Sequence, residues 1–248
     1  GYVDRLKAMV AAGTDPDVMR LPGPDAHEFF GSAVTQKLDG LMRRDGFRPD
    51  ALAGPFDGAT YNKAWHAFPR GRASSWGIFY DRDRFLRMGL RDPETGWTWV
   101  QMLDVAMRVT DRESDTWGLS IEPLAAFPVP WIWGAGGDDI DRGAQVPGWE
   151  SQAAREALAW VHALRHVHQV APGAGVHAGV DALCRGRVAM WFGCADDEFA
   201  LRRLGAKNFG FATQPRGRAG QAAAWHPDVV AIGARAPSPD DAWEFLQY

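Results

Sequence analysis

The chain has 248 residues, a formal net charge of −4, and 46% hydrophobic and 23% charged residues. This length allows one large domain or two small ones, and the composition is that of a soluble globular protein. The mild charge gives no basis for a nucleic-acid partner, and the longest nearly uncharged run, residues 123–137, is too short and too rich in proline to span a membrane. Cys184 and Cys194 are too few for a disulfide framework, and we expect that they form no disulfide.

The first part of the chain predicts helices around one strand. Apolar residues at helical spacing predict a helix over residues 2–12, which Gly13 ends. The sequence AAGTDPDV, residues 11–18, leads into a strand, and a second helix follows at about residues 25–32. Prolines then break residues 38–56 into short helices.

Residues 67–85, AFPRGRASSWGIFYDRDRF, form the stretch around which the chain is organised. A short apolar segment ends at Pro69, and an arginine-rich break follows it. Residues 76–80 are apolar and aromatic, which predicts a buried strand. Asp81 is placed to cap the helix that begins after this strand.

The remaining two thirds of the chain alternate helices with strands. A capping-box pattern at Thr98 opens a helix, and a long amphipathic helix over residues 151–168 places Ala154, Leu158, Val161, Leu164 and Val167 inward. This alternation predicts an α/β fold with mostly parallel sheets. The predicted helices are 98–109, 123–133, 151–168, 178–185, 196–204 and 238–246, and the strands are 116–121, 188–192, 209–213 and 229–232.

These segments resemble, in order, those of extracellular solute-binding proteins of carbohydrate ABC transporters, the maltose-binding-protein-like family 1. The resemblance covers nearly the whole chain, but the first strand and helix of the family and its last helical segment are missing. We therefore expect a chain that is truncated at both ends. The resembling segments are AAGTDPDV at 11–18, the stretch 67–85, WIWGAGG at 131–137, ALCRGRVAMW at 182–191 and APSPDDAWEFL at 236–246.

The resemblance implies an α/β fold of the periplasmic-binding-protein-like type II class, with two lobes of mixed sheets joined by crossover strands. Lobe one, which would be incomplete, is expected to hold residues 1–73 and 229–248, and lobe two residues 74–228. The strand 229–232 should then share a sheet with the strand that begins at Val18, while the strand 209–213 lies in the other lobe.

The implied function is non-catalytic binding of a sugar or oligosaccharide in an interlobe cleft, with hinge closure and delivery to the permease subunits of an ABC importer. The resemblance implies a periplasmic or extracellular monomer without a cofactor or metal, anchored to the membrane as a lipoprotein in its full length. The expected ligand-binding residues are Asp25, Arg70, Arg72, Ser75, Trp76, Trp131, Asp196, Trp225 and His226.

Each of these residues also has an ordinary structural explanation. The guanidinium group of arginine suits sugar hydroxyls, but an arginine is equally typical of a solvated loop. The flat ring of tryptophan suits a sugar ring, but a tryptophan is equally typical of a core. Asp25 follows a strand, where α/β folds bind ligands, yet it can also cap a helix. Asp196 begins a helix and favours its dipole, Trp225 and His226 fit a packed hinge, and Trp131 shares a helix with Trp133, so that at most one of them faces a ligand.

Three other functions stay open from the sequence. A carbohydrate hydrolase would use two of Asp25, Asp196 and Glu198 as acid and base. The same fold would also suit a polyamine, a ferric ion or a peptide, although the scattered tyrosines disfavour iron. A third alternative is a structural fragment with an incomplete site. We expect no metal at His162 and His166, which should face solvent, because no H-E-x-x-H pattern is present.

Overall fold

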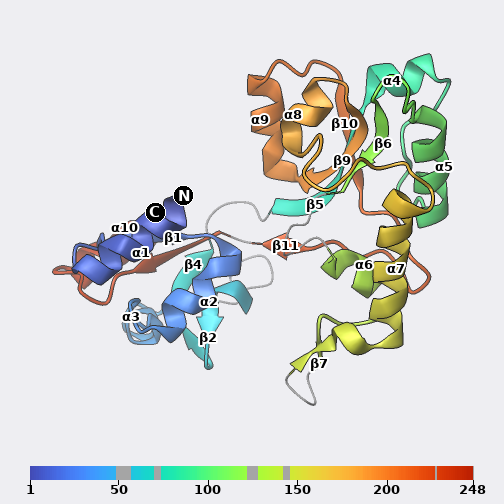
Figure 1. The fold of residues 1–248 in the computed structure, drawn as a ribbon. Helices are drawn as coiled ribbons and strands as arrows, with labels where there is room; N and C mark the ends of the chain where they lie inside the picture. The colour runs from blue at the N-terminus through green and yellow to red at the C-terminus, as the bar shows by residue number, and fades with distance from the viewer. Residues whose placement is uncertain (49–56, 70–73, 122–127, 142–145, 227, 248) are drawn as a thin grey trace. The chain divides into compact units, whose positions relative to one another are not determined.

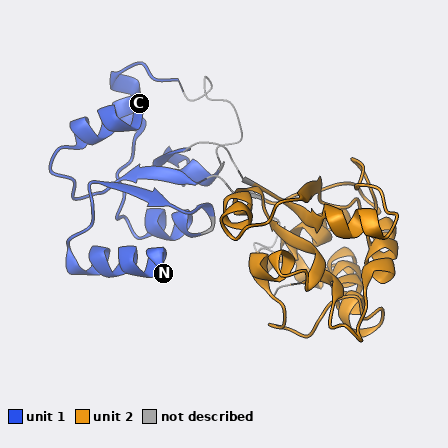
Figure 2. Ribbon diagram, turned by 90° about the horizontal axis from the view of Figure 1, so that it is seen from above, with its two compact units in different colours: residues 1–73, 226–248 blue, residues 74–225 orange. Residues whose placement is uncertain are grey.

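The computed structural model describes the chain except residues 49–56, 70–73, 122–127, 142–145, 227 and 248, and the side chains of Pro24, Asp57, Ser74, Asp141, Trp225 and His226. Two compact units make up the chain (Figure 2). Unit 1 comprises residues 1–73 and 226–248, and unit 2 comprises residues 74–225. Each unit has its own sheet with helices on both faces (Figure 1).

The sheet of unit 1 has three strands in the order β1 (Val18–Leu21), β12 (Val229–Ile232) and β4 (Ala67–Pro69). Both ladders are antiparallel, with Val18 opposite Ile232 and Val229 opposite Pro69. The predicted sharing of a sheet by strands 18–21 and 229–232 is therefore confirmed.

Helices cover both faces of this sheet because alternate strand residues are apolar on each side. On one face α1 (Tyr2–Ala12) and α2 (Gly23–Gly31) place Leu6, Phe29 and Phe30 against Met19 and Leu21. On the other face, α3 (Asp39–Arg44) and α10 (Pro239–Gln247) place Met42 and Trp243 against Phe68 and Ile232. The 3-10 turn η2 (Asp57–Ala59) and the ribbon of β2 (Thr60–Tyr61) and β3 (Ala64–Trp65) complete unit 1.

The sheet of unit 2 has the order β10 (Phe209–Thr213), β5 (Ser74–Asp81), β9 (Val188–Cys194) and β6 (Trp117–Ser120), and β11 (Trp225–His226) also pairs with β5. Strand β5 is the buried aromatic strand that the sequence predicts, and Phe79 pairs with Trp191 on one side and Phe211 on the other. The first segment of unit 1 ends at residue 73, and β5 begins at Ser74. Strand β5 is therefore the first strand of unit 2.

The two faces of this sheet bury different helices (Figure 1). On one face, α5 (Trp99–Val109), α6 (Val129–Gly134) and α7 (Gln152–His166) pack with Ile78, Tyr80 and Phe192. On the other face, α8 (Gly179–Cys184) and α9 (Glu198–Arg203) pack with Phe79 and Trp191. The remaining elements are α4 (Arg82–Arg87), η3 (Gly148–Glu150), η4 (Ala195–Asp197) and the hairpin of β7 (Ile140–Asp141) and β8 (Val146–Pro147).

The expectation of mostly parallel sheets is wrong, and the reason lies in one strand of each sheet. The helix-connected strands β6, β9 and β10 do run in the same direction, since β6 pairs with β9 in parallel and both β9 and β10 are antiparallel to β5. Strand β5 enters from the other unit and runs against its neighbours, as β12 does in unit 1. The mixed sheets that the family resemblance implies are thereby confirmed.

Local signals in the sequence place most helix ends correctly. The side chain of Asp81 accepts a hydrogen bond from the Arg84 backbone, and Thr98 forms the predicted capping box with Gln101. The prediction that Val167 faces inward is wrong: its side chain is 70% exposed, because α7 ends at His166 and helical periodicity no longer applies to the next residue. Cys184 and Cys194 form no disulfide.

Candidate functional site

Four of the nine predicted ligand-binding residues cannot be placed as side chains. Arg70 and Arg72 lie outside the described residues. For Trp225 and His226 the structure describes the backbone, which forms β11 beside β5. The remaining five residues are described within their own units, with Asp25 in unit 1 and Ser75, Trp76, Trp131 and Asp196 in unit 2.

Trp76 stands near the start of β5, where the backbone amide of this residue donates to the carbonyl of Ala224 at 3.0 Å. Its ring is partly exposed and lies nearly parallel to the ring of Phe192, with centroids 5.2 Å apart. This support from β9 holds the indole in one orientation. The neighbouring Ser75 is also partly buried, and its hydroxyl donates to the Trp76 carbonyl at 3.4 Å.

Trp131 lies deeper, in the core that α5, α6 and α7 form on the sheet. Its side chain is 1% exposed, and its ring centroid is 5.4 Å from Trp99 and 6.4 Å from Phe192. On the same helix Trp133 is only partly buried, and its indole N–H donates to Asp139 at 3.3 Å. The two tryptophans thus point in different directions, as their spacing predicts.

Asp139 forms a carboxylate pair with Asp138 beside Trp133. Burial, and then the hydrogen bond that its protonated carboxyl donates to Asp138, raise the pKa of Asp139, while accepting this hydrogen bond is the chief cause that lowers the pKa of Asp138. Asp139 therefore keeps a proton to higher pH than an exposed aspartate does. This arrangement belongs to the turn that precedes the hairpin of β7 and β8.

The acidic candidates occupy helix starts. Asp25 is partly buried in the first turn of α2, and its backbone amide donates to Pro22 at 2.9 Å. Asp196 is exposed in η4, where the next residue, Asp197, accepts the backbone N–H of Cys194 at 2.8 Å. Glu198 pairs with Arg202 at 2.6 Å. A hydrolase would need two of these three carboxylates. It would therefore use either Asp25 of unit 1 together with a carboxylate of unit 2, or Glu198, which already pairs with Arg202.

Gln214 is a polar residue that the sequence analysis missed. It follows β10 directly, and its side chain is 1% exposed. Among the described residues, neither of its amide atoms has a hydrogen-bond partner, and the same is true of the buried indole nitrogens of Trp76 and Trp160. No local pattern in the sequence indicates that Gln214 is buried, because a glutamine after a strand is typical of an exposed turn.

An aromatic pocket of about 440 Å³ lies elsewhere in unit 2, at the start of α5. Its walls include the nearly parallel rings of Trp99 and Trp160, with centroids 5.7 Å apart. Glu156 and Arg218 form an ion pair of 3.0 Å at this pocket. Arg216 also lines this pocket, so one carboxylate stands against two guanidinium groups and the charged part of the lining is net positive.

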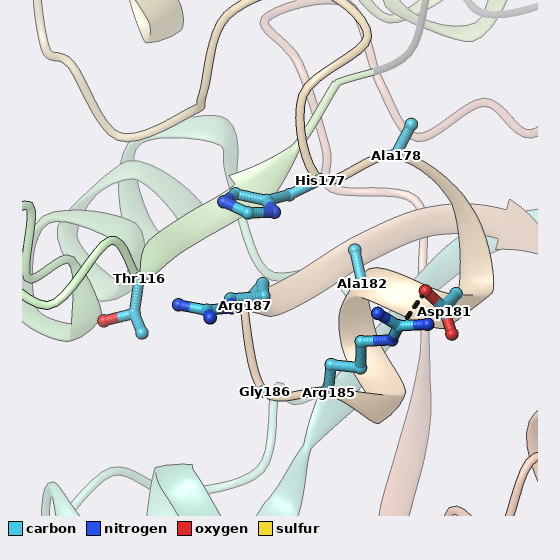
Figure 3. A pocket seen from close by; sticks show the side chains of 8 residues that line it. All are labelled: Thr116, His177, Ala178, Asp181, Ala182, Arg185, Gly186 and Arg187. Carbon is cyan, nitrogen blue, oxygen red and sulfur yellow. Dashed lines mark ion pairs between the residues drawn. The ribbon is translucent and has the colours of Figure 1, made fainter.

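A polar pocket of about 490 Å³ lies between β6 and α8 (Figure 3). Its acidic and basic side chains are paired: Asp181 with Arg185 at 2.9 Å, and His177 with Asp115 at 2.7 Å. The hydrogen bond from Trp117, and then that from His177, lower the pKa of Asp115. The charged side chains at this pocket therefore already have partners within the protein.

The histidines of α7 are exposed, as predicted, and the rings of His162 and His166 are nearly parallel with centroids 4.2 Å apart. The described residues contain no group of three or more His, Cys, Asp or Glu side chains that could hold a metal ion. Within the same residues, no helix combines the length and the apolar character needed to cross a membrane.

The chain matches the family of bacterial extracellular solute-binding proteins over residues 1–248, and it belongs to that family. No curated protein matches the chain. Solved structures of solute-binding proteins share its fold, so the periplasmic-binding-protein-like type II class is confirmed.

Three of these similar structures show the extent of the likeness. An ABC substrate-binding protein from Listeria monocytogenes in complex with cycloalternan has a TM-score of 0.87 at 19% identity, and the match covers 99% of this chain and 64% of that one. A solute-binding protein from Thermotoga lettingae bound with α-D-tagatose has a TM-score of 0.84 at 20% identity over 100% and 66% of the two chains. UgpB from Mycobacterium tuberculosis in complex with glycerophosphocholine has a TM-score of 0.81 at 18% identity over 98% and 62%. The chain thus spans less than two thirds of the length of each of these proteins.

Proposed function

We propose that this protein binds a sugar or oligosaccharide reversibly and delivers it to the permease subunits of an ABC importer, without making or breaking a bond. The observation that carries the proposal is the partly exposed ring of Trp76, fixed on Phe192 at the start of β5. Such a rigid aromatic face suits the apolar side of a sugar ring, and the membership of the chain in an extracellular solute-binding family supports the same role.

The other predicted ligand-binding residues, with the exception of the buried Trp131, stay part of this proposal. The two units would act as the two lobes that the resemblance implies, and the ligand would shift an equilibrium between open and closed forms. Arg70, Arg72, Asp25, Asp196 and His226 would supply hydrogen bonds, while Trp225 would add a second aromatic face. Trp131 would support the aromatic face of Trp76 indirectly, because it is buried and its ring packs near Phe192, on which the Trp76 ring lies.

The location and the anchoring follow the same reasoning. The family is one of extracellular proteins, which supports a place outside the cytoplasmic membrane. Anchoring of the full-length protein as a lipoprotein, and its monomeric state, are parts of the proposal that rest on the resemblance alone.

The proposal is tested by a thermal-shift screen of the chain against monosaccharides, oligosaccharides, polyamines, glycerophosphocholine and divalent metals. A ligand that binds only the folded state raises the unfolding midpoint, by an amount that grows with the logarithm of the ligand concentration relative to its dissociation constant. We expect a carbohydrate to raise the midpoint and to be recovered unchanged. A shift with polyamines alone, or hydrolysis of the oligosaccharides, would replace this function by one of its rivals.

A further inference from the structure

The aromatic pocket at the start of α5 is a mainly apolar cavity that the proposed carbohydrate site does not use. All its lining residues belong to unit 2, and none of them is among the predicted ligand-binding residues. Its volume of about 440 Å³ is within the usual range of a small-molecule site. The partly exposed rings of Trp99 and Trp160, together with Val100 and Ala135, give it walls that suit a flat apolar ligand.

Hydrogen bonds hold the loop after β10 against the start of α5 and so fix the shape of this pocket. The backbone amide of Arg216 donates to the carbonyl of Trp97 at 2.7 Å, and the backbone amide of Trp99 donates to the carbonyl of Arg216 at 3.2 Å. The Trp99 indole also donates to the carbonyl of Pro215 at 3.1 Å, which orients its ring. A ligand therefore meets walls that are already formed, and little of the binding free energy is lost in ordering them.

The charged part of the lining favours a negative ligand. Glu156 is already paired with Arg218 at 3.0 Å. Arg216 is exposed and, within the part of the chain that the structure describes, has no ion-pair partner, so its guanidinium is the unbalanced charge of the pocket. A guanidinium binds a carboxylate through two parallel hydrogen bonds, and the N-terminus of α5 adds the positive end of a helix dipole.

We infer that this pocket is a second binding site, for a small aromatic carboxylate whose ring lies against Trp99 and Trp160 and whose carboxylate binds Arg216. An aromatic ammonium compound would place a second positive charge beside Arg216, and a small hydrophilic anion would leave the indole rings in contact with water. The inference goes beyond the proposed function and does not rest on it, because the pocket is formed by unit 2 alone.

The test is calorimetric titration of the parent chain with phenylacetate, and with phenethylamine and acetate as matched compounds. Phenethylamine combines the same ring with an ammonium group, and acetate has the carboxylate without the ring. We expect phenylacetate to bind about ten-fold more tightly than either of the other two, because it alone meets both the indole rings and the guanidinium. Equal binding of phenethylamine or of acetate would overturn the inference, and so would the absence of phenylacetate binding.

Arg216→Glu reverses the charge of an exposed side chain, while the hydrogen bonds of this residue to α5 come from its backbone. We expect this variant to bind phenylacetate about five-fold more weakly or worse and phenethylamine more tightly than the parent does. Arg216→Gln, which only removes the charge, should bind phenylacetate with an affinity between those of the parent and Arg216→Glu.

Arg203→Glu is the matched control, since it makes the same change of net charge at an exposed residue of α9, which packs on the opposite face of the sheet. Its affinity for both compounds should stay within about two-fold of the parent, roughly the effect of a surface substitution. Equal changes in Arg216→Glu and Arg203→Glu, or unchanged binding in both, would overturn the inference.

Discussion

For the tryptophan side chains, the sequence predicts burial but not the hydrogen-bond partners. The twelve tryptophans predict a core that is rich in indoles with a few rings left for a ligand surface, and Trp97, Trp131, Trp191 and Trp243 are indeed buried. Most of the hydrogen-bond partners come from distant segments, as when Trp97 donates to the carbonyl of Thr213 at 2.8 Å. The sequence cannot specify such partners, because they depend on which strands lie side by side.

Asp45 provides a test at the residue scale. The hydrogen bond from Arg44, and then the one from the indole N–H of Trp243, lower the pKa of Asp45 to about 2. Because the folded state holds this proton less tightly than the unfolded chain, the contribution of Asp45 to stability is complete above the ordinary aspartate pKa of about 4 and is lost as the pH falls towards about 2. Urea unfolding between pH 6 and pH 2 should therefore show a flatter loss of stability for Asp45→Asn than for the parent.

Asp17→Asn serves as the control for this experiment, since Asp17 is exposed and lies outside the contacts of Asp45. Its stability should follow the parent over the whole pH range. Parallel curves for Asp45→Asn and the parent would show that the carboxylate of Asp45 has no special role.

At the scale of elements, the contact between β6 and α5 is close enough to require a glycine. A Cβ atom at Gly118 would lie 2.3 Å from the carbonyl oxygen of Ala106 and 2.6 Å from its Cα, and both are backbone atoms that cannot rotate away. Gly118→Ala should therefore reduce the free energy of unfolding by about 1–3 kcal/mol or more, as overpacked cores do. Denaturant unfolding measures this effect.

Gly40 offers the matched control, because nothing lies within 4 Å of a Cβ placed there and the residue is helical in α3. Gly40→Ala should leave the protein as stable as the parent or stabilise it by up to about 1 kcal/mol, since alanine favours a helix. The account of the β6–α5 contact would fail if the two alanine variants were equally stable.

The start of α5 gives a second test at this scale. The Thr98 hydroxyl accepts the backbone N–H of Gln101 at 3.2 Å, and the Gln101 side chain accepts the backbone N–H of Thr98 at 2.7 Å. Thr98→Ala should destabilise the protein by about 1 kcal/mol, the usual effect of losing such a cap. Thr95→Ala, at an exposed position before the helix, should have no measurable effect in the same urea titration.

The capping box of Thr98 was predictable because its signal is contained in four consecutive residues. The same holds for the cap at Asp81 and for the strand 229–232, which the structure places at the predicted bounds. The error at Val167 arose at a helix end, where periodicity extends in the sequence beyond the last helical residue. Local chemistry thus determines where these helices begin, whereas apolar periodicity alone does not mark where α7 stops.

At the scale of the whole molecule, the family resemblance predicted the mixed sheets, whereas the alternation of helices and strands did not. Alternation alone predicts parallel sheets, whereas β5 and β12 each run against their neighbours because the chain passes from one unit to the other. The burial of Gln214 likewise depends on packing between distant segments, which explains why the sequence alone did not indicate it.

The central claim is that the chain binds a carbohydrate through an aromatic face at the start of β5. Calorimetric titration of the parent, Trp76→Ala and Trp225→Ala with the sugar from the screen tests it most directly. We predict reversible binding by the parent and a loss of about 1–3 kcal/mol of binding free energy in each variant, as for a buried aromatic anchor. Equally tight binding by all three proteins, or no binding of any carbohydrate by the parent, would contradict the account.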